Sequence, residues 1–163
     1  MRTTGWVIAV LALAAPAHGD PTPFDQSRIS VSVRVGEQTV YGFNHFSLGA
    51  GVGYYVLDGL QVGLAALHQF GDGPSINEVT PSVSYVAQPL VGRWAVIPYI
   101  GGFFNHWFLG DANADINTVG GRAGLLRLSG RMVFGLGVAY EHTLSTCTDC
   151  DFFYPDISVG VTF

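Results

Sequence analysis

Apolar and polar residues alternate one by one along most of the chain after residue 27. The run that ends the sequence, residues 155–163 (PDISVGVTF), has apolar residues at positions 157, 159, 161 and 163, with small or polar residues between them. Successive side chains of a strand point to opposite faces, so this period of two predicts a strand with one apolar face.

The same pattern recurs often enough to predict an all-β chain with no helix after residue 20. The predicted strands cover residues 28–35, 43–56, 60–70, 79–88, 94–107, 118–128, 131–142 and 155–163. The connections after the first, third, fifth and seventh strands are longer and polar, whereas the others are tight, as at Asp58-Gly59 and Ser129-Gly130. An even number of strands with alternating connections predicts an eight-stranded antiparallel up-and-down β-barrel.

Two of these strands carry a complication. Residues 94–107 are apolar on both faces, so the pattern leaves open which side faces inward. Pro81 lies within the fourth strand and has no N–H group to donate, so we expect a bulge or a lost ladder bond there.

Composition favours a transmembrane barrel over a soluble one. An exported lipocalin-like barrel or a jelly roll would show the same alternation with its apolar side turned inward. However, only 12% of the residues are charged, about half the usual share, and we expect the charges mostly in the connections. A terminal Phe163 also suits a membrane interface. Aromatic residues predict two interfacial girdles, one at the loop ends (Phe43, Phe46, Phe70, Phe104, Trp107 and Tyr140) and one at the turn ends (Tyr54, Tyr85, Trp94, Phe134 and Phe163).

The N-terminus has the pattern of a secretion signal. Arg2 precedes ten apolar residues, 6–15, and Ala17-His18-Gly19 fits a cleavage site, with Ala15-Pro16-Ala17 as the other candidate. We therefore expect a signal peptide at residues 1–19 and a barrel domain at residues 20–163, exported in a Gram-negative host. The net charge of −5 and the lack of a basic patch argue against a nucleic-acid partner.

The segments GVGYYVLDGLQVGLAA and WAVIPYIGG resemble strands of the small bacterial outer-membrane β-barrel proteins of the OmpA/OmpX type. The final strand resembles the C-terminal signature that the barrel-assembly machinery recognises, here through Phe163. The resemblance implies a cell outer-membrane location, contact with membrane lipid and lipopolysaccharide, and a porin-like fold. We expect a monomer.

Polar residues on the other strand face predict a lumen filled by side chains. An Arg facing lipid at mid-membrane costs roughly 2–4 kcal/mol, so Arg122 is expected inside. An eight-stranded barrel is just wide enough for side chains to fill it. We expect a plugged lumen, with a narrow channel as the alternative. The predicted lumen network comprises Arg34, His45, Gln61, Gln69, Arg122 and Glu141, with Gln88 also pointing inward.

One pair of residues in this lumen set has catalytic residue types. His45 and Ser47 resemble the His-x-Ser pair of outer-membrane lipid A deacylases. In that family Asn follows the Ser and the pair faces lipid, whereas here Leu48 follows and the pair points inward. We expect no enzyme, with a lipid A-modifying esterase as an alternative.

The outer connections contain the remaining candidate chemistry. Cys147 and Cys150 are the only cysteines, and an exported chain is expected to join them in a disulfide. Zinc needs further ligands, for which His142, His68 and His106 are the candidates. Residues 111–117 resemble a calcium loop but have Ile116 and Arg122 where such a loop needs Gly and Glu. We expect no metal or cofactor, and a role in envelope integrity, adhesion or loop-mediated surface binding.

Overall fold

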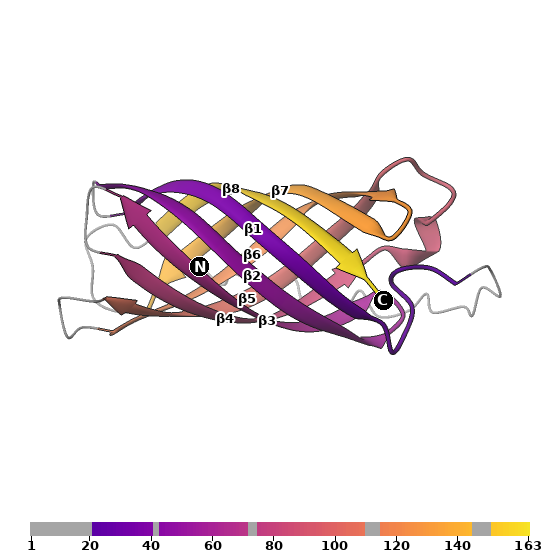
Figure 1. Ribbon diagram of the computed structural model, residues 1–163, viewed down its shortest axis with the longest axis horizontal. Helices are drawn as coiled ribbons and strands as arrows, with labels where there is room; N and C mark the ends of the chain where they lie inside the picture. Colours follow the sequence, from indigo (N-terminus) through magenta and orange to yellow (C-terminus); the bar gives the residue numbers. More distant parts are fainter. Residues whose placement is uncertain (1–20, 41–42, 72–74, 110–114, 145–150) are drawn as a thin grey trace, which may run out of the picture.

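The protein is a closed barrel of eight antiparallel strands, each paired with its neighbours in sequence (Figure 1). The computed structural model describes residues 21–40, 43–71, 75–109, 115–144 and 151–163. The strands are β1 (Ile29–Val40), β2 (Phe43–Leu57), β3 (Leu60–Gly71), β4 (Ile76–Val86), β5 (Ile97–Leu109), β6 (Asp115–Ser129), β7 (Met132–Thr143) and β8 (Asp151–Thr162). A short 3₁₀ turn, η1 (Gln88–Leu90), follows β4. No helix in the described part of the chain is long and apolar enough to cross a bilayer. The predicted fold class, an up-and-down barrel of eight strands, is confirmed.

The two ends of the barrel differ in the segments that they hold, and we call them the terminal end and the loop end. The terminal end holds the start of β1, the end of β8 and the β2–β3, β4–β5 and β6–β7 connections. The loop end holds the other connections, beginning with the one between Val40 and Phe43. In Figure 1 the loop end lies at the left and the terminal end at the right.

The predicted alternation of long and short connections is wrong in two places. Residues 36–40, expected in a polar connection, extend β1 because each pairs with a residue of β2, from Gly36 with Ser47 to Val40 with Phe43. The connection between β4 and β5, expected to be short, runs from residue 87 to 96 and includes η1. Strand pairing thus overrides the local polar composition of residues 36–40.

The apolar face of the alternating pattern points away from the barrel axis. Large side chains on every strand are exposed at the outer surface, and Leu136, Ile100 and Leu64 are each more than half exposed. Ser, Thr, Gln and Glu side chains occupy the inward positions, many of them buried. This arrangement contradicts the soluble barrel, which would bury its apolar face, and it forms a continuous apolar surface that hydrocarbon solvates better than water.

The lumen is closed at each end by a cluster of apolar side chains. At the terminal end, Phe24 packs with Tyr55, Val86, Ile97 and Leu126. At the loop end, Ile76 and Trp107 pack against Leu109, Ile116 and Phe152.

Residues from two unexpected places form these clusters. Phe24 comes from the lead before β1 and is fully buried, held by a hydrogen bond from the Gly59 N–H to its carbonyl at 2.8 Å. Trp107, expected in the outer girdle, points inward and is 1% exposed, which resolves the facing of β5. Trp94 precedes β5 and lies in the connection at the terminal end.

Pro81 interrupts one ladder, as expected. Pairing between β3 and β4 runs through Pro81 opposite Leu64, but pairing between β4 and β5 stops at Val79 and resumes at Ser82. A proline cannot donate the missing ladder bond, so the gap falls on its β5 side.

Candidate functional site

The polar lumen is the richest concentration of chemistry in the described residues. All six predicted lumen residues lie on inward positions: His45, Gln69, Arg122 and Glu141 are buried, and Arg34 and Gln61 are half-buried. Gln88, also expected inside, lies instead in η1 and donates to Asp25 at 3.1 Å.

Glu141 on β7 is held by neutral donors from neighbouring strands. The Asn105 Nδ2 group donates to Oε1 at 2.7 Å, the Tyr154 hydroxyl donates to Oε2 at 2.8 Å, and the Thr118 hydroxyl also donates to Oε1. The side chain is almost completely buried. A buried carboxylate needs such donors because desolvation otherwise penalises its charge.

Glu78 on β4 forms a second buried carboxylate site that the sequence analysis missed. Gln69 donates to one of its oxygens at 3.0 Å and Thr80 donates to the other at 2.7 Å. The polar composition predicted a loop at residue 78, yet residues 76, 78 and 80 continue the inward alternation of Ser82 and Ser84. That parity was the signal that could have found it.

The two arginines of the lumen lie apart from these carboxylates. Both ion pairs among the described residues involve histidines, so neither Arg34 nor Arg122 pairs with an acid. The Arg122 guanidinium lies over the Phe103 ring, 5.1 Å from its centroid, and its buried Nε has no hydrogen-bond partner. Arg34, Arg122 and Glu141 all lie in the lumen, but neither arginine forms an ion pair with Glu141.

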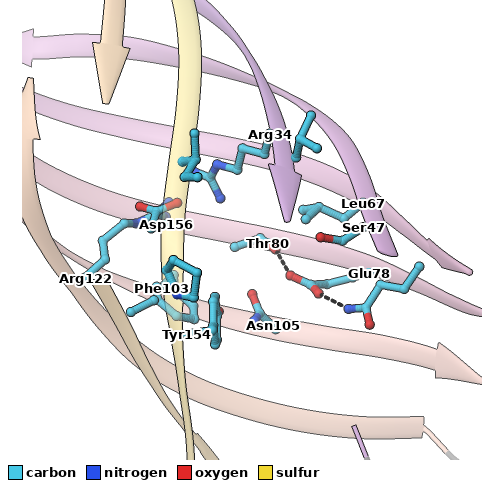
Figure 2. A pocket seen from close by; sticks show the side chains of 15 residues that line it. Arg34, Ser47, Leu67, Glu78, Thr80, Phe103, Asn105, Arg122, Tyr154 and Asp156 are labelled. Carbon is cyan, nitrogen blue, oxygen red and sulfur yellow. Dashed lines mark hydrogen bonds between the residues drawn. The ribbon is translucent and has the colours of Figure 1, made fainter. Parts of the chain in front are cut away.

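A cavity of about 50 Å³ separates the two arginines from the carboxylates. Figure 2 shows Arg34, Arg122 and Asp156 on one side of it and Glu78 with Thr80 on the other. Asp156, which the sequence analysis did not select, accepts a hydrogen bond from the Tyr99 hydroxyl at 2.9 Å.

A second cavity of about 110 Å³ lies toward the terminal end. Five serines line it, together with apolar side chains and with Arg34, Arg122 and Asp156, which it shares with the first cavity. Gln61 spans two strands there: its Nε2 group donates to Ser30 at 2.6 Å, and Ser84 donates to its Oε1 at 3.4 Å. Serine and glutamine side chains can bind water or each other. The hydrogen bonds of Ser30 and Ser84 in this cavity go to Gln61 and not to a side chain that could activate a nucleophile as a general base.

The His45 and Ser47 side chains are both buried and lie on the inward face of β2. Both therefore face the lumen, as their parity predicted. An esterase would also need an acid beside the histidine, and the buried Glu141 instead accepts hydrogen bonds from Asn105, Thr118 and Tyr154.

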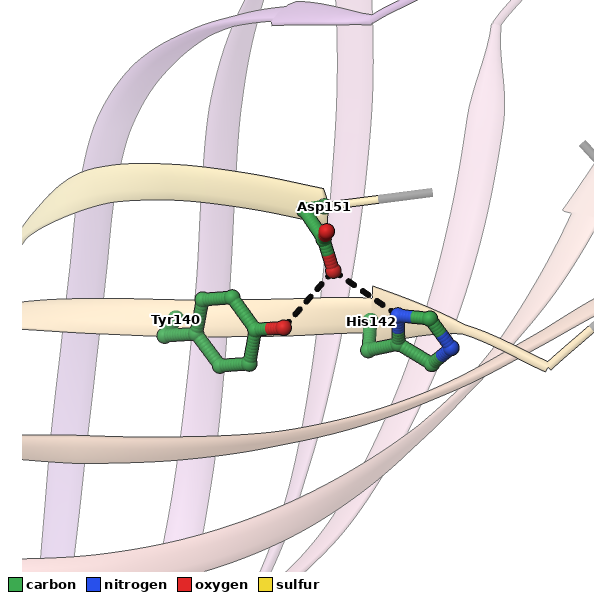
Figure 3. Close-up of polar contacts among 3 residues, drawn as sticks. All are labelled: Tyr140, His142 and Asp151. Carbon is green, nitrogen blue, oxygen red and sulfur yellow. Dashed lines mark hydrogen bonds and ion pairs between the residues drawn. The ribbon is translucent and has the colours of Figure 1, made fainter. Parts of the chain in front are cut away.

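A histidine paired with an asparagine or aspartate recurs three times on the outer surface of the barrel at the loop end. His68, His106 and His142 each bring Nδ1 to within 2.8–2.9 Å of an Oδ1 atom directly opposite on the next strand, from Asn77, Asn117 and Asp151 respectively. An aromatic ring accompanies each pair. Phe70 stacks on His68, Phe108 meets His106 edge-on, and the Tyr140 hydroxyl donates to Asp151 at 2.7 Å (Figure 3).

These histidines do not converge on a metal. They belong to three separate hairpins, and the described residues contain no group of three or more side chains that could hold a metal ion. Cys147 and Cys150, the expected disulfide, lie outside the described residues, as do residues 1–19 and most of the 111–117 loop.

No family profile and no curated protein sequence matches the chain. Solved structures do match. The N-terminal β-barrel domain of Pseudomonas aeruginosa OprF superposes with a TM-score of 0.65 at 15% identity, covering 85% of this chain and 98% of that one. Neisserial surface protein A (NspA) superposes with a TM-score of 0.55 at 15% identity, covering 83% and 94%. A structure titled "De novo design of transmembrane beta-barrels" gives 0.55 at 19% identity, covering 85% and 98%. The chain therefore has the fold of the small bacterial outer-membrane β-barrels that its strand pattern resembles.

Proposed function

We propose that this protein is an integral barrel of the cell outer membrane with a structural or surface-interaction role: envelope integrity, adhesion or binding through the loop end. In this proposal the loop end faces the cell surface and the terminal end faces the periplasm. Export by a signal peptide at residues 1–19 belongs to the proposal, as does a disulfide between Cys147 and Cys150.

The observation that carries the proposal is the combination of an apolar exterior with a lumen closed at both ends. Trp107 and Ile76 close one end, and Phe24 with its four partners closes the other. Between them the carboxylates of Glu78 and Glu141 are bound by neutral donors. Such an interior stabilises the barrel and leaves no wide axial path for solutes. A narrow channel and an esterase are accordingly not proposed.

The outer rim supports a role at the surface. The three His–Asx pairs, with their rings, form a belt around the loop end where a barrel meets lipid headgroups and the external medium. The proposed surroundings are outer-membrane lipid and lipopolysaccharide. The exposed Phe163 ring at the terminal end is available to the barrel-assembly machinery, and we propose a monomer.

Conductance across a planar bilayer tests the closed lumen. The wild-type protein is expected to give no steady wide pore. A double variant Phe24→Ala/Trp107→Ala is expected to conduct because it removes a buried aromatic ring from each end cluster. A steady wide conductance of the wild-type protein would overturn the proposal. Gel migration of boiled and unboiled samples in detergent checks that both proteins are folded, since an intact barrel migrates differently from the boiled chain.

A second experiment separates the structural from the interactive role. Cells that lack the protein are complemented with the wild-type chain or with a chain whose loop-end connections 72–74, 110–114 and 145–150 are replaced by Gly and Ser. A structural role predicts that both chains restore resistance to detergent. A surface-binding role predicts that only the wild-type chain restores adhesion. If neither chain changes either property, the proposed role is wrong.

A further inference from the structure

The wall of the barrel is unevenly paired around its circumference. Twelve residue pairs join β1 to β2 and eleven join β7 to β8, but only five join β1 to β8, from Ser30 with Thr162 to Arg34 with Ser158. All five lie near the terminal end. From Val35 of β1 and Ile157 of β8 onward to the loop end, these two strands are not paired with each other. We call this unpaired stretch the seam.

The 50 Å³ cavity lies beside the seam. Here the lining includes Val35, Pro155 and Ile157, which point outward, together with the inward residues Arg34 and Asp156. The cavity therefore borders the stretch of both strands where no ladder pairing joins β1 to β8.

Pro155 fits the behaviour of β8 as an edge strand at this point. A proline has no N–H group and is found in sheets at edges, where no ladder bond is required. It pairs with Val138 of β7 on one side and has no partner on β1. The residue thus favours a seam that stays unpaired.

The two arginines that line the cavity form no ion pair with an acid among the described residues. The carboxylates of Glu78, Glu141 and Asp156 each accept hydrogen bonds from neutral donors. Arg122 is 8% exposed, with an unpartnered Nε, and neither it nor Arg34 forms an ion pair within the described residues. Glu78 and Asp156 line the same cavity and offset the two positive charges at longer range, but neither carboxylate is in contact with a guanidinium. A guanidinium in this situation binds carboxylate or phosphate well, since both offer paired oxygens.

We propose that the seam is a lateral portal through which the acidic headgroup of a membrane amphiphile, a carboxylate or a phosphate, enters the cavity and binds Arg34 and Arg122. The acyl chain stays outside, against Val35 and Ile157. The apolar clusters close both axial routes, so the seam is the route that the described residues leave to this cavity. A volume of about 50 Å³ admits a small acidic group but not a whole lipid. The inference rests on the proposed membrane location.

Binding of defined amphiphiles to the protein in zwitterionic nanodiscs tests the arginine site. The probes are a spin-labelled fatty acid, a lysophosphatidic acid and, as the comparison with no net charge, the zwitterionic lysophosphatidylcholine. Both acidic probes, or one of them, are expected to bind at least about tenfold more tightly than the zwitterionic probe. Preference for the first or the second identifies carboxylate or phosphate as the natural headgroup.

The variants Arg122→Gln and Arg34→Gln are expected to weaken acidic binding by about tenfold or more. Arg122→Lys keeps the positive charge and should therefore retain part of the binding of the acidic probes. Arg127→Gln is the matched control, because Arg127 is exposed on the outward face of β6, near the terminal end, and should bind as the wild type does. Equal affinity for acidic and zwitterionic probes, or unchanged binding in both lumen variants, would contradict the proposal.

The portal itself is tested by closing the seam. In a Cys147→Ser/Cys150→Ser background, Val35→Cys/Ile157→Cys is bridged with a short bismaleimide, and Val33→Cys/Val159→Cys, in the paired part of the same strands, is the control. Bridging the first pair is expected to abolish acidic binding, whereas bridging the second is expected to leave it unchanged. Normal binding after the first bridge rules out the portal.

Hydrogen exchange gives an independent measure of the seam. Backbone amides of residues 35–40 should exchange faster than those of residues 30–34, because the latter are paired on both sides. Equal protection of the two sets would mean that the seam is closed. The gel migration and conductance of these proteins report on membrane insertion and the closed lumen, so a failed portal is distinguishable from a failed proposed function.

Discussion

Buried carboxylates are held in this barrel by hydroxyl and amide donors and not by arginine. Glu141 has three such donors, and Glu78 has two. Neutral donors avoid the cost of desolvating a second charge, which is the main penalty in a buried ion pair. The same choice leaves Arg34 and Arg122 available for another partner.

Glu141→Gln tests this arrangement at a single residue. An amide places an NH₂ group opposite the hydroxyl and amide donors that now point at an oxygen, so at least one bond is lost. The free energy of unfolding is expected to fall by about 1–3 kcal/mol. Urea unfolding in lipid vesicles, followed by gel migration, measures it. His142→Gln, at the next position but exposed on the outward face, is expected to change stability by less than about 0.5 kcal/mol. Similar losses in the two variants would contradict the account.

Trp107 provides a second test at the residue scale. In a Trp6→Phe/Trp94→Phe variant it is the only tryptophan of the chain, and it is buried inside the barrel. Lipids brominated on their acyl chains should therefore quench its fluorescence weakly. The matched Trp6→Phe/Trp107→Phe variant leaves Trp94, which is 59% exposed at the terminal end and should be quenched more strongly. The reverse order would mean that Trp107 faces lipid.

At the scale of elements, the period-two pattern predicted the eight strands because nearly all of them have an apolar face and a polar face. The pattern cannot predict which face of a strand points inward where both faces are apolar, as in β5. Trp107 was therefore predicted on the wrong face. The pattern also failed at strand ends. Residues 36–40 and 76–78 are polar enough to suggest loops. However, residues 36–40 pair with β2, and residues 76–78 pair with β3 and β5, so the strands continue through them.

The candidate site was only partly predictable for a related reason. Parity placed the six lumen residues inward, but it could not say which of them touch. The contacts of Glu141 come from β5, β6 and β8, and the distances across the lumen depend on the register of all the strands between them. Phe24 gave no periodic signal because it lies in the irregular lead before β1. The seam is likewise a matter of register between the first and last strands.

Phe24→Ala tests the cluster at the terminal end as an element. A fully buried Phe side chain is replaced by a cavity, so unfolding is expected to become easier by about 3–5 kcal/mol. Phe153→Ala is the matched control, since the Phe153 ring is 73% exposed on the outer surface. Urea midpoints in the same vesicles measure both. A loss at Phe24 no larger than that at Phe153 would show that the lead does not close the barrel.

At the scale of the whole molecule, the main feature is that the usual distribution of polar and apolar side chains is inverted. The barrel has polar and charged side chains within and large apolar ones outside, from Leu64 and Ile100 to Leu136. Such a surface is stable in hydrocarbon, where the ladders between neighbouring strands satisfy most of the backbone and the seam is the exception. The clusters at the ends, the neutral donors of the lumen and the His–Asx belt at the rim are consequences of filling and bounding that cylinder.

Spin-label accessibility in a bilayer measures this inversion most directly. A label at Leu136 points outward and should collide with oxygen dissolved in the acyl chains but not with a water-soluble nickel chelate. A label at Ser158, which faces inward at nearly the same height on β8, should be protected from both. Strong collision of the Leu136 label with the nickel chelate, together with low oxygen exposure, would contradict the account.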